Sequence, residues 1–501
     1  MMTWFNDYIV PVLQFLATLF ITAIGIAVLA VFIMYIRDKT QRKKTILRNY
    51  PVIGRFRYFF EHLGEFFRQY FFAMDREELP FNRAQRSWVY RAAKNLSTTT
   101  AFGSTKNLTP EGTVIFVNAA YPPQEHEKQS PTPLTIGPQA RKPYVTSSFF
   151  NISAMSFGSL SKPAIQALSR GAKQAGIWLN TGEGGLSPYH LEGGCDVVFQ
   201  LGTAKYGARD KDGNLDENKL KEIANYPQVK MIELKLAQGA KPGKGGILPA
   251  EKVTPEIAKI RGIPAGQASL SPNRHLDAGN NEELIDLINR LRNVSGLPVG
   301  IKIVLSSEFW MDEFLQAILK RGPEYAPDFI TVDGGDGGTG AAPQALIDEM
   351  GLQLKESLPL LVDKLNEYGL RKRIKVIASG KRINPSEVAW ALCMGADFVN
   401  NARGFMFALG CIQAMQCNKN TCPTGITTHD EKLQSGLVVE NKAERVANFA
   451  KTMRKEVETI AHSCGAPEPR KLKRRHARIV SQNGLSVPLN QLHPDKSPAS
   501  D

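Results

Sequence analysis

Eight short apolar runs recur in the central part of the chain, and most of them are followed by a polar or glycine-rich turn and then by a helical pattern. The runs are Phe149–Ala154, Ile177–Thr181, Val197–Leu201, Met231–Leu236, Val299–Leu305, Phe329–Asp333, Lys375–Ser379 and Asp397–Asn401. Eight strands that alternate with helices over about 255 residues have the number and length of a barrel. The sequence therefore predicts an α/β fold, a (β/α)8 barrel of the TIM type, with an open doubly wound sheet as the alternative.

Glycine-rich and polar loops follow the ends of these runs. The loops are Met155–Gly158, Gly182–Gly185, Gly239–Gly246, Gly334–Gly340 and Ser379–Lys381. In a barrel the carboxyl ends of all eight strands meet on one face, where active sites lie. We therefore expect these loops to form one shared site.

The loop Gly335–Gly340 matches the dinucleotide fingerprint. That fingerprint needs a second strand ending in an acidic residue about 20 positions further on, whereas residues 344–368 have a helical pattern. Glycines also let backbone N–H groups approach a phosphate closely, as in the phosphate sites of barrels. The loop is therefore interpreted as a phosphate site, with a flexible loop that binds no ligand as the alternative.

The run from Tyr8 to Ile36 contains 29 residues and no charged side chain. Because about 20 apolar residues span a bilayer, residues 8–36 predict a transmembrane helix. Basic residues follow it at once, so the positive-inside rule places the long C-terminal body in the cytoplasm. A cleaved signal peptide is the alternative, but it would carry its basic residues before the apolar run. The sequence thus predicts a single-pass membrane protein.

The rest of the chain divides into an N-terminal helical and irregular segment, residues 46–145, a barrel at 146–430 and a helical C-terminal tail at 431–501. In the first segment, apolar residues recur at helical spacing from Phe59 to Tyr70, and core packing is favoured over contact with the membrane or a barrel end. One strand is expected at Val114–Val117. The net charge of +14 includes a second basic cluster, Arg470–Arg478. We interpret it as a solvated surface rather than a lipid-binding one, and predict no nucleic-acid partner.

Three of the six cysteines lie within twelve residues. Cys411, Cys417 and Cys422 have five and then four residues between them, and Pro423 follows. Thiolates are the usual ligands of iron–sulfur clusters, and a proline after the last cysteine occurs in ferredoxins. Three ligands favour a 3Fe-4S cluster over a 4Fe-4S cluster with a labile iron. A zinc site with His429 is an alternative. The scattered Cys195, Cys393 and Cys464 are expected to be small core residues.

Several motifs occur in a fixed order between residues 151 and 428. They are Asn-Ile-Ser-Ala-Met-Ser-Phe-Gly (151–158), Asn-Thr-Gly-Glu-Gly-Gly (180–185), Gln-Gly-Ala-Lys-Pro-Gly (238–243), Gly-Gly-Thr-Gly (337–340) and the segment 410–428. This stretch, a little over half the chain, closely resembles the FMN-binding synthase domain of glutamate synthases. The resemblance implies FMN at the carboxyl ends of the strands and a 3Fe-4S cluster next to it. It also implies a reaction in which 2-oxoglutarate and ammonia condense to an imine that reduced FMN converts into glutamate.

The resemblance also implies roles for individual residues. Met155 and Ser156 would line the flavin edge. Lys302 would stabilise the anionic reduced ring, unless it is a structural ion pair with an acid such as Glu233. The FMN phosphate would be held by Gly337, Gly338, Ser379, Gly380 and Gly404. The residues implied for catalysis and 2-oxoglutarate binding are Lys235, Lys241 and Arg261, with Glu183 holding the ammonia or imine nitrogen.

Two residues depart from the family pattern. Ile247 stands where glutamine is usual, and Lys244 stands where an acidic residue is usual. A lost hydrogen-bond partner changes substrate preference substantially. The leading prediction is a membrane-anchored, glutamate-synthase-like oxidoreductase. The alternatives are an FMN and iron–sulfur electron-transfer module, or an enzyme like N-alkylglutamate synthase.

The partners follow from what the sequence lacks. It contains no recognisable NADPH or FAD domain, so electrons are expected to come from a ferredoxin or a reductase subunit. Glutaminase domains of large glutamate synthases use an N-terminal cysteine, whereas this chain has none before Cys195. We therefore expect free ammonia or an amine, not glutamine, to be the nitrogen donor.

Overall fold

The structure is a computed structural model that describes residues 4–496 of the chain. It divides into two compact units, residues 1–83 and residues 84–501. The first unit contains the long apolar helix, and the second holds the barrel.

Eight parallel strands close into a barrel in the order β10-β11-β12-β13-β4-β5-β6-β7. They are β4 (Phe150–Ile152), β5 (Leu179–Asn180), β6 (Val197–Leu201), β7 (Val229–Lys235), β10 (Val299–Ile303), β11 (Phe329–Asp333), β12 (Lys375–Ser379) and β13 (Phe398–Asn401). Each coincides with one of the eight predicted runs. The barrel prediction is confirmed, and the open sheet is excluded because β13 pairs with β4.

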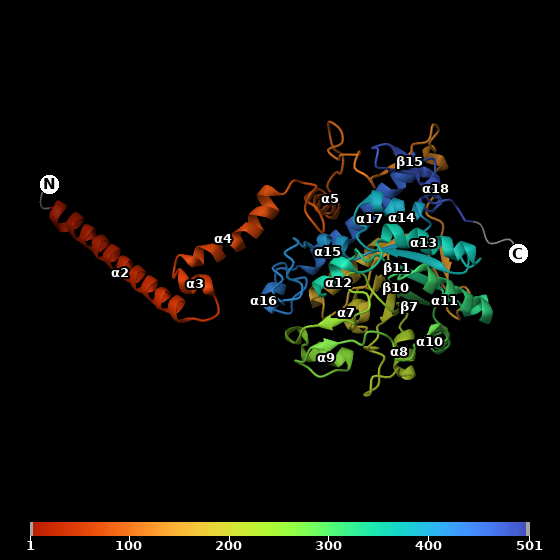
Figure 1. Ribbon diagram of the computed structural model, residues 1–501, viewed down its shortest axis with the longest axis horizontal. Helices are drawn as coiled ribbons and strands as arrows, with labels where there is room; N and C mark the ends of the chain where they lie inside the picture. Colours follow the sequence, from red (N-terminus) through yellow and green to blue (C-terminus); the bar gives the residue numbers. More distant parts are fainter. Residues whose placement is uncertain (1–3, 497–501) are drawn as a thin grey trace. The chain divides into compact units, whose positions relative to one another are not determined.

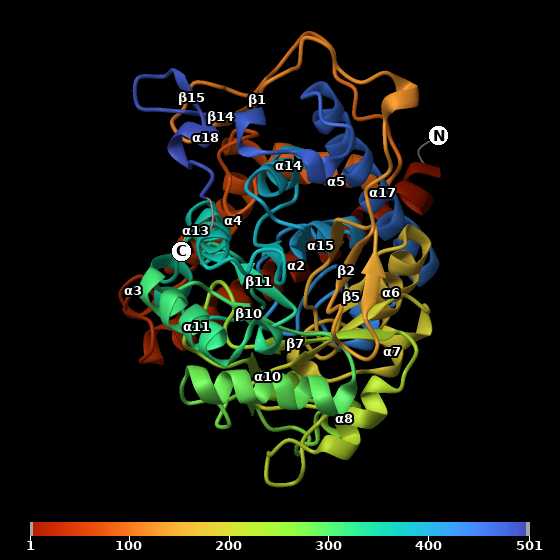
Figure 2. The same ribbon diagram turned by 90° about the vertical axis from the view of Figure 1, so that its right-hand side faces the viewer.

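Helices surround the barrel (Figures 1 and 2). They are α6 (Lys162–Ala175), α7 (Pro188–Glu192), α8 (Glu217–Ala224), α9 (Pro255–Arg261), α10 (Asn281–Ser295), α11 (Glu308–Arg321), α12 (Gln344–Glu349), α13 (Leu354–Glu367), α14 (Pro385–Cys393) and α15 (Arg403–Leu409). α6 shows why these segments become helices: Ser161 accepts a hydrogen bond from Ala164 N at the start, and Gly176 ends the helix with a φ of 65°. The expected helical pattern after Gly340 is confirmed by α12 and α13, which argues against a dinucleotide fold there.

A hairpin closes the end of the barrel at which the strands begin. It pairs β2 (Leu134–Ile136) with β3 (Tyr144–Thr146) in antiparallel register. Ile136 and Tyr144 are buried against residues from the first halves of the strands, among them Phe329 and Phe398. Because this end is filled with apolar side chains, the opposite end of the barrel is the one left open for a site.

The C-terminal tail packs directly on the barrel. After α16 (Glu431–Gln434), the long helix α17 (Val439–Ser463) lies along α6 (Figure 2). It is followed by β14 (Ala477–Val480), β15 (Ser486–Pro488) and α18 (Leu489–Leu492), so the predicted helical tail also contains strands. β14 pairs with the strand expected near Val114, β1 (Val114–Phe116). Residues 497–501 of the predicted tail lie outside the described residues.

The second basic cluster is partly internal. Arg474 is buried and forms an ion pair with Asp363. Arg470 donates to backbone carbonyls of Asp397, Thr132 and Ser147. These arginines hold the tail on the barrel, and the interpretation of the cluster as a solvated surface is wrong for both.

The first unit is a chain of helices. It contains η1 (Phe5–Ile9), α2 (Val10–Thr40), α3 (Thr45–Asn49), α4 (Gly54–Phe67) and η2 (Arg68–Phe72), and α5 (Arg83–Ala93) begins at its boundary with the second unit. The helix Phe5–Thr40 is long and apolar enough to cross a membrane. In α4 and η2, Phe59, Phe60, Phe66 and Tyr70 are exposed. The expectation that they pack in a core is therefore wrong.

Candidate active site

A cavity opens at the carboxyl ends of the barrel strands. Every strand or the loop directly after it contributes to its lining: Met155 and Ser156 after β4, Gly182 and Glu183 after β5, Gln200 in β6, Lys235 in β7, Lys302 in β10, Asp333 in β11, Ser379 in β12, and Asn400 and Asn401 in β13. The predicted loops therefore meet in one site, as the barrel topology requires.

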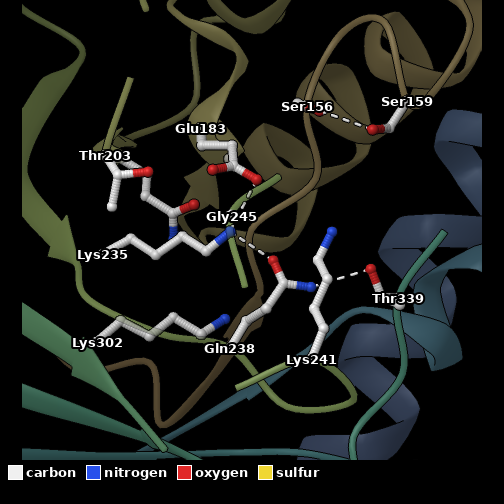
Figure 3. A network of polar contacts seen from close by, with 12 residues as sticks. Ser156, Ser159, Glu183, Thr203, Lys235, Gln238, Lys241, Gly245, Lys302 and Thr339 are labelled. Atoms are coloured by element: carbon white, nitrogen blue, oxygen red, sulfur yellow. Dashed lines mark hydrogen bonds and ion pairs between the residues drawn. The ribbon is translucent and has the colours of Figure 1, made fainter. Parts of the chain in front are cut away.

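A buried ion pair forms the centre of the cavity wall. Lys235 Nζ lies 2.8 Å from Glu183 Oε1 and also donates to Gln238 Oε1. Gln238 Nε2 then donates to Thr339 Oγ1 at 3.0 Å (Figure 3). Burial raises the pKa of Glu183, but Lys235, Lys241 and Arg261 outweigh it and hold the pKa below its ordinary value. Glu183 is therefore a carboxylate, an acceptor of hydrogen bonds.

Two glycines make room for the Glu183 side chain. A Cβ on Gly246 would lie 2.3 Å from Glu183 Oε1, and a Cβ on Gly202 would lie 2.7 Å from Glu183 Cβ. Any side chain at either position would displace the carboxylate. The position of the Glu183 carboxylate therefore explains why residue 246, at the end of the loop Gly239–Gly246, is a glycine.

Lys241 is buried on the other side of the same cavity. Its Nζ donates to Ala341 O at 3.2 Å. Burial lowers its pKa to about 8, helped by the charges of Lys235 and Lys244, while Glu183 acts in the opposite direction. Lys244 is exposed. The residue that departs from the family pattern thus acts on Lys241 through its charge.

Lys302 forms a second buried ion pair. Its Nζ lies 3.2 Å from Asp333 Oδ2, which also accepts from Gly239 N at 2.9 Å. Burial lowers the pKa of Lys302, yet Asp333 and Glu233 outweigh it and raise the pKa above its ordinary value. Glu233 itself accepts hydrogen bonds from Asn180, Gln200 and Thr331. The cation is therefore fixed at the cavity, and its direct partner is Asp333.

Arg261 lies behind the cavity wall. It is buried, donates to Ser269 Oγ at 3.2 Å and to Phe157 O at 3.5 Å, and its guanidinium stands 5.1 Å from the Tyr206 ring centroid. Cβ atoms on Gly158 and Gly184 would each lie 3.1 Å from its Nη2. Arg261 therefore lies against the glycine loops that border the cavity and is not among the residues that line it.

The predicted phosphate-binding residues fall into two groups. Gly338, Ser379 and Gly380 line the cavity. In contrast, Gly337 N donates to Gly334 O at 2.8 Å, and Gly404 N donates to Asn401 Oδ1 at 2.7 Å. The N–H groups of the second group are engaged within the protein. They shape the loop and the start of α15.

Several cavity residues were given no role of their own from the sequence, although Thr339 and Lys381 lie in loops that were expected to form the site. They are Gln200, Gln238, Lys252, Asp333, Thr339, Lys381, Asn400 and Arg403. Asp333 is the last residue of a predicted strand and Asn400 the second-last of another, and a polar residue at the carboxyl end of a barrel strand could have identified both as site residues. Oδ1 of Asn400 is buried, and among residues 4–496 no donor reaches it. A buried acceptor without a partner at a cavity wall is a suitable contact for a ligand donor.

The three clustered cysteines lie in the loop after α15. Cys411 Sγ accepts from Gln413 N at 3.4 Å, and Cys422 Sγ lies 3.4 Å from Thr424 Oγ1. Burial raises the pKa of Cys411. Burial acts in the same sense on Cys422, but hydrogen bonds from Thr424 and Thr427 outweigh it and lower its pKa. In the part of the chain that the structure describes, no three His, Cys, Asp or Glu side chains form a ready metal site.

Two cations reach the cysteine loop. Lys252 is buried, and its Nζ donates to Ser159 O at 2.8 Å and to Cys417 O at 3.2 Å. Arg403 Nη1 lies 3.9 Å from Cys417 Sγ. Cys417 itself lines the cavity. The cavity lined by Lys235, Lys241 and Lys302 is therefore also bordered by the cysteine loop, residues 411–422. Cys195, Cys393 and Cys464 are buried elsewhere, as predicted.

Sequence comparison assigns this barrel to a class of oxidoreductases. The profile of the conserved region in glutamate synthase matches residues 116–467, which are 352 of the 501 residues. The chain belongs to the glutamate synthase family and is an oxidoreductase of the glutamate synthase type. It is 39% identical over 498 residues to the glutamate synthase large subunit-like protein YerD of Bacillus subtilis, covering 92% of this chain and 94% of that one.

Other relatives are longer. The chain is 32% identical over 337 residues to an archaeal-type glutamate synthase [NADPH] of Dehalococcoides mccartyi, covering 67% of this chain and 63% of the relative. Among solved structures, a flavocytochrome b2 mutant with benzoylformate matches at a TM-score of 0.46 and 13% identity, over 79% of this chain and 78% of that one. A mandelate oxidase mutant with 2-hydroxy-phenylacetamide also has a TM-score of 0.46, at 15% identity, over 79% of this chain and 98% of that one.

Proposed function

We propose that this protein is an FMN-dependent oxidoreductase that reductively aminates a 2-oxo acid with ammonia, 2-oxoglutarate being the leading substrate. The observation that carries the proposal is the set of buried lysines, Lys235, Lys241 and Lys302, that extend into one cavity around the carboxylate of Glu183 (Figure 3). Buried cations bind anionic groups strongly because little water screens them. Two of them are neutralised by protein carboxylates, whereas Lys241 donates to a backbone carbonyl and forms no ion pair with residues 4–496.

The cavity has features that fit FMN. Asn400 Oδ1 needs a donor, Lys302 supplies a fixed cation, and the backbone at Gly338 and Gly380 lines the wall with no side chain in between. Met155 and Ser156 line the same cavity. Bound FMN would supply hydride transfer to the substrate. Lys302, held in place by Asp333, would stabilise negative charge on the isoalloxazine ring of FMN.

The substrate roles follow from charge and position. Lys241 is the cation best placed to bind a substrate carboxylate. Glu183, an ionised acceptor beside Lys235, can hold N–H groups of ammonia or of an imine. Arg261 would act by holding the loop around Gly158 and Gly184. Formation of an imine from a 2-oxo acid and ammonia releases water, and hydride plus a proton then gives the amino acid.

One part of the wall favours a different substrate. Ile247 and Leu248 line the cavity in β8 (Ile247–Leu248), which pairs with β9 (Ser269–Leu270). An apolar wall at the family's glutamine position suits a larger or N-alkylated amine, as in an enzyme like N-alkylglutamate synthase. An FMN and iron–sulfur electron-transfer module is the further alternative.

Anaerobic reduction followed by a substrate screen tests the proposal. The reduced protein is mixed with 2-oxo acids and either ammonia or alkylamines, and flavin reoxidation is followed by absorbance. Lys241→Ala should raise the KM for the oxo acid by roughly 100-fold, since it removes a charge-assisted contact of about 3 kcal/mol. Lys211→Ala is the matched control, because Lys211 is exposed. Rapid flavin-to-cluster transfer without turnover on any pair would favour the electron-transfer module instead.

The affinity for the oxo acid should depend on the protonation of Lys241. Because its pKa is lowered to about 8, KM should rise as pH increases through that value, by about tenfold per unit above it. Lys244→Gln removes a charge that lowers this pKa, so the alkaline limb should move to higher pH by a few tenths of a unit. Lys211→Gln should leave it in place. If the KM of Lys241→Arg rises over the same alkaline pH range as the KM of the wild type, the group that titrates is not Lys241.

The free energy of unfolding should rise with pH over a range in which the affinity for the oxo acid falls. An unfolded lysine titrates near 10.4, so between about 8 and 10.4 the unfolded chain binds more protons at Lys241 than the folded one. The free energy of unfolding therefore rises with pH in this window. Urea unfolding of Lys241→Met should lack this rise.

We further propose that Cys411, Cys417 and Cys422 bind an iron–sulfur cluster, 3Fe-4S being favoured by the three ligands. The three thiols share one loop. Gln413 N and the Thr424 hydroxyl lie within hydrogen-bonding distance of two of the sulfurs, as donors suited to thiolates, and the loop borders the cavity. A ferredoxin or a reductase subunit would then deliver electrons to the cluster and the flavin.

The helix Phe5–Thr40 is proposed to anchor the protein in a membrane with the barrel on the cytoplasmic side. Removal of residues 1–83, the whole first unit, should move the protein into the soluble fraction and leave the flavin content unchanged, because the barrel belongs to the other compact unit. Fractionation with a high-salt wash and flavin absorbance measure the two results. If the truncated chain still sediments with membranes, the first unit is not the sole anchor.

A further inference from the structure

The helix that follows the apolar span has two distinct faces. Its apolar side chains recur at helical spacing, and at about 100° per residue they fall on one side; they are Phe56, Phe59, Phe60, Leu63, Phe66 and Phe67. Arg57, Glu61, Glu65 and Arg68 occupy the opposite side. Phe59 and Phe60 are 58% and 60% exposed, and Phe71 and Phe72 in η2 are 66% and 73% exposed. Large aromatic side chains in such a row indicate a binding surface.

The bend between α2 and α4, residues 38–55, is called the elbow here. Hydrogen bonds within it hold the start of α4 against the end of α2. Asp38 near the end of α2 accepts from Val52 N at 3.0 Å and from Arg55 Nε and Nη2 at 2.8 and 2.6 Å. At Gly54 a Cβ would lie 3.1 Å from Ile46 O, so α3 and α4 touch through backbone. Figure 1 shows the resulting bend, in which α4 leaves the end of α2 at an angle.

The segment that leads from α2 into α4 is strongly basic, with most of its charge between Arg37 and Arg48, whereas α4 itself has equal numbers of Arg and Glu residues. Between Arg37 and Phe72 the sequence has nine Lys or Arg and three Asp or Glu residues, a net charge of +6. Lys44 Nζ stands 4.3 Å from the Tyr58 ring centroid, which brings the juxtamembrane charge to α4. Basic residues beside an apolar span are attracted to anionic lipid headgroups.

We propose that α4 and η2, residues 54–72, lie in the interface of the same bilayer that α2 spans, with their phenylalanine face in the acyl boundary. This inference rests on the proposed anchorage by α2. Interfacial helices combine a Phe- or Leu-rich face with a charged polar face and modest overall hydrophobicity. Here the elbow holds the helix at the end of the span, and its charge matches an anionic leaflet. Because Asp38 ties the start of α4 to the end of α2, the surface of the bilayer that α2 spans is the nearest apolar partner of α4.

Site-directed spin labelling of the full chain tests this placement. Nitroxides are attached to Phe60→Cys on the apolar face and to Glu61→Cys on the polar face, and the wild-type chain measures labelling of native cysteines. Each protein is reconstituted into phosphatidylcholine–phosphatidylglycerol vesicles. Flotation of the vesicles first measures anchorage. Collision rates with oxygen, which enters the bilayer, and with a water-soluble nickel chelate then measure depth. The expected ratio of oxygen to nickel collisions is about tenfold higher at position 60 than at 61.

The outcomes separate the two proposals. If the protein does not float with the vesicles, the anchorage fails and the interfacial placement with it. If it floats but both positions show equal nickel access, the interfacial placement alone is overturned. Strong immobilisation at position 60 with little access to either reagent would show that the face packs on protein, and would also overturn it. Phe59→Cys and Glu65→Cys repeat the comparison at other positions of the two faces and should give the same contrast.

Discussion

Lys235→Met should destabilise the protein by about 3 kcal/mol, the lower end of the range for breaking a buried ion pair. Lys235 and Glu183 are both largely buried, with side chains 9% and 16% exposed and 2.8 Å between Nζ and Oε1. The variant leaves the Glu183 carboxylate without its donor. Lys241 and Arg261 still lower its pKa, which is why the cost lies at the lower end. Urea unfolding measures the difference.

The double variant Lys235→Met/Glu183→Gln separates stability from chemistry. Removing both charges should recover most of the lost stability, because neither member of the pair is left as an unpaired buried charge. Turnover should stay reduced by at least about 1,000-fold, since an ionised acceptor and a cation are both missing from the cavity. Lys230→Met in the same strand is the control: its pair with Asp196 at 3.8 Å is exposed and should matter by less than about 1 kcal/mol. Recovery of turnover in the double variant would remove the pair from the proposed mechanism.

Cys417→Ser should abolish iron and acid-labile sulfide in anaerobically prepared protein, because a cluster with only three thiolate ligands does not survive the loss of one. Iron and sulfide assays and the electron paramagnetic resonance signal of the oxidised cluster measure the loss, and FMN absorbance is expected to persist. Cys195→Ser is the matched control, since Cys195 is buried beside Ser169, 3.8 Å between Sγ and Oγ, far along the chain from the loop. Wild-type protein that holds stoichiometric zinc and no iron would refute the cluster.

The sequence alone determined the barrel and the face on which its site lies. Runs such as Val197–Leu201 are fully buried strands, and strands buried on both sides are recognisable as continuous apolar segments. The carboxyl ends of parallel strands must share one face, so the glycine-rich loops that contain Glu183 and Lys241 were expected to meet. The resemblance to glutamate synthases implied Lys235 and Lys302 beside them. The apolar span of α2 was likewise evident, because length and lack of charge suffice to define it.

Other features were not visible in the sequence. That Lys302 pairs with Asp333 and not with Glu233 depends on side chains of three different strands. Spacing along the chain also gave no sign that Arg261 lies against Gly158 and Gly184 outside the cavity lining, or that Lys252 reaches the cysteine loop. The amphipathic pattern of α4 was apparent, yet the same period fits core packing and surface exposure equally. Periodicity defines which residues share a face, whereas only the tertiary structure decides what each face meets, because that depends on contacts between segments far apart in the chain.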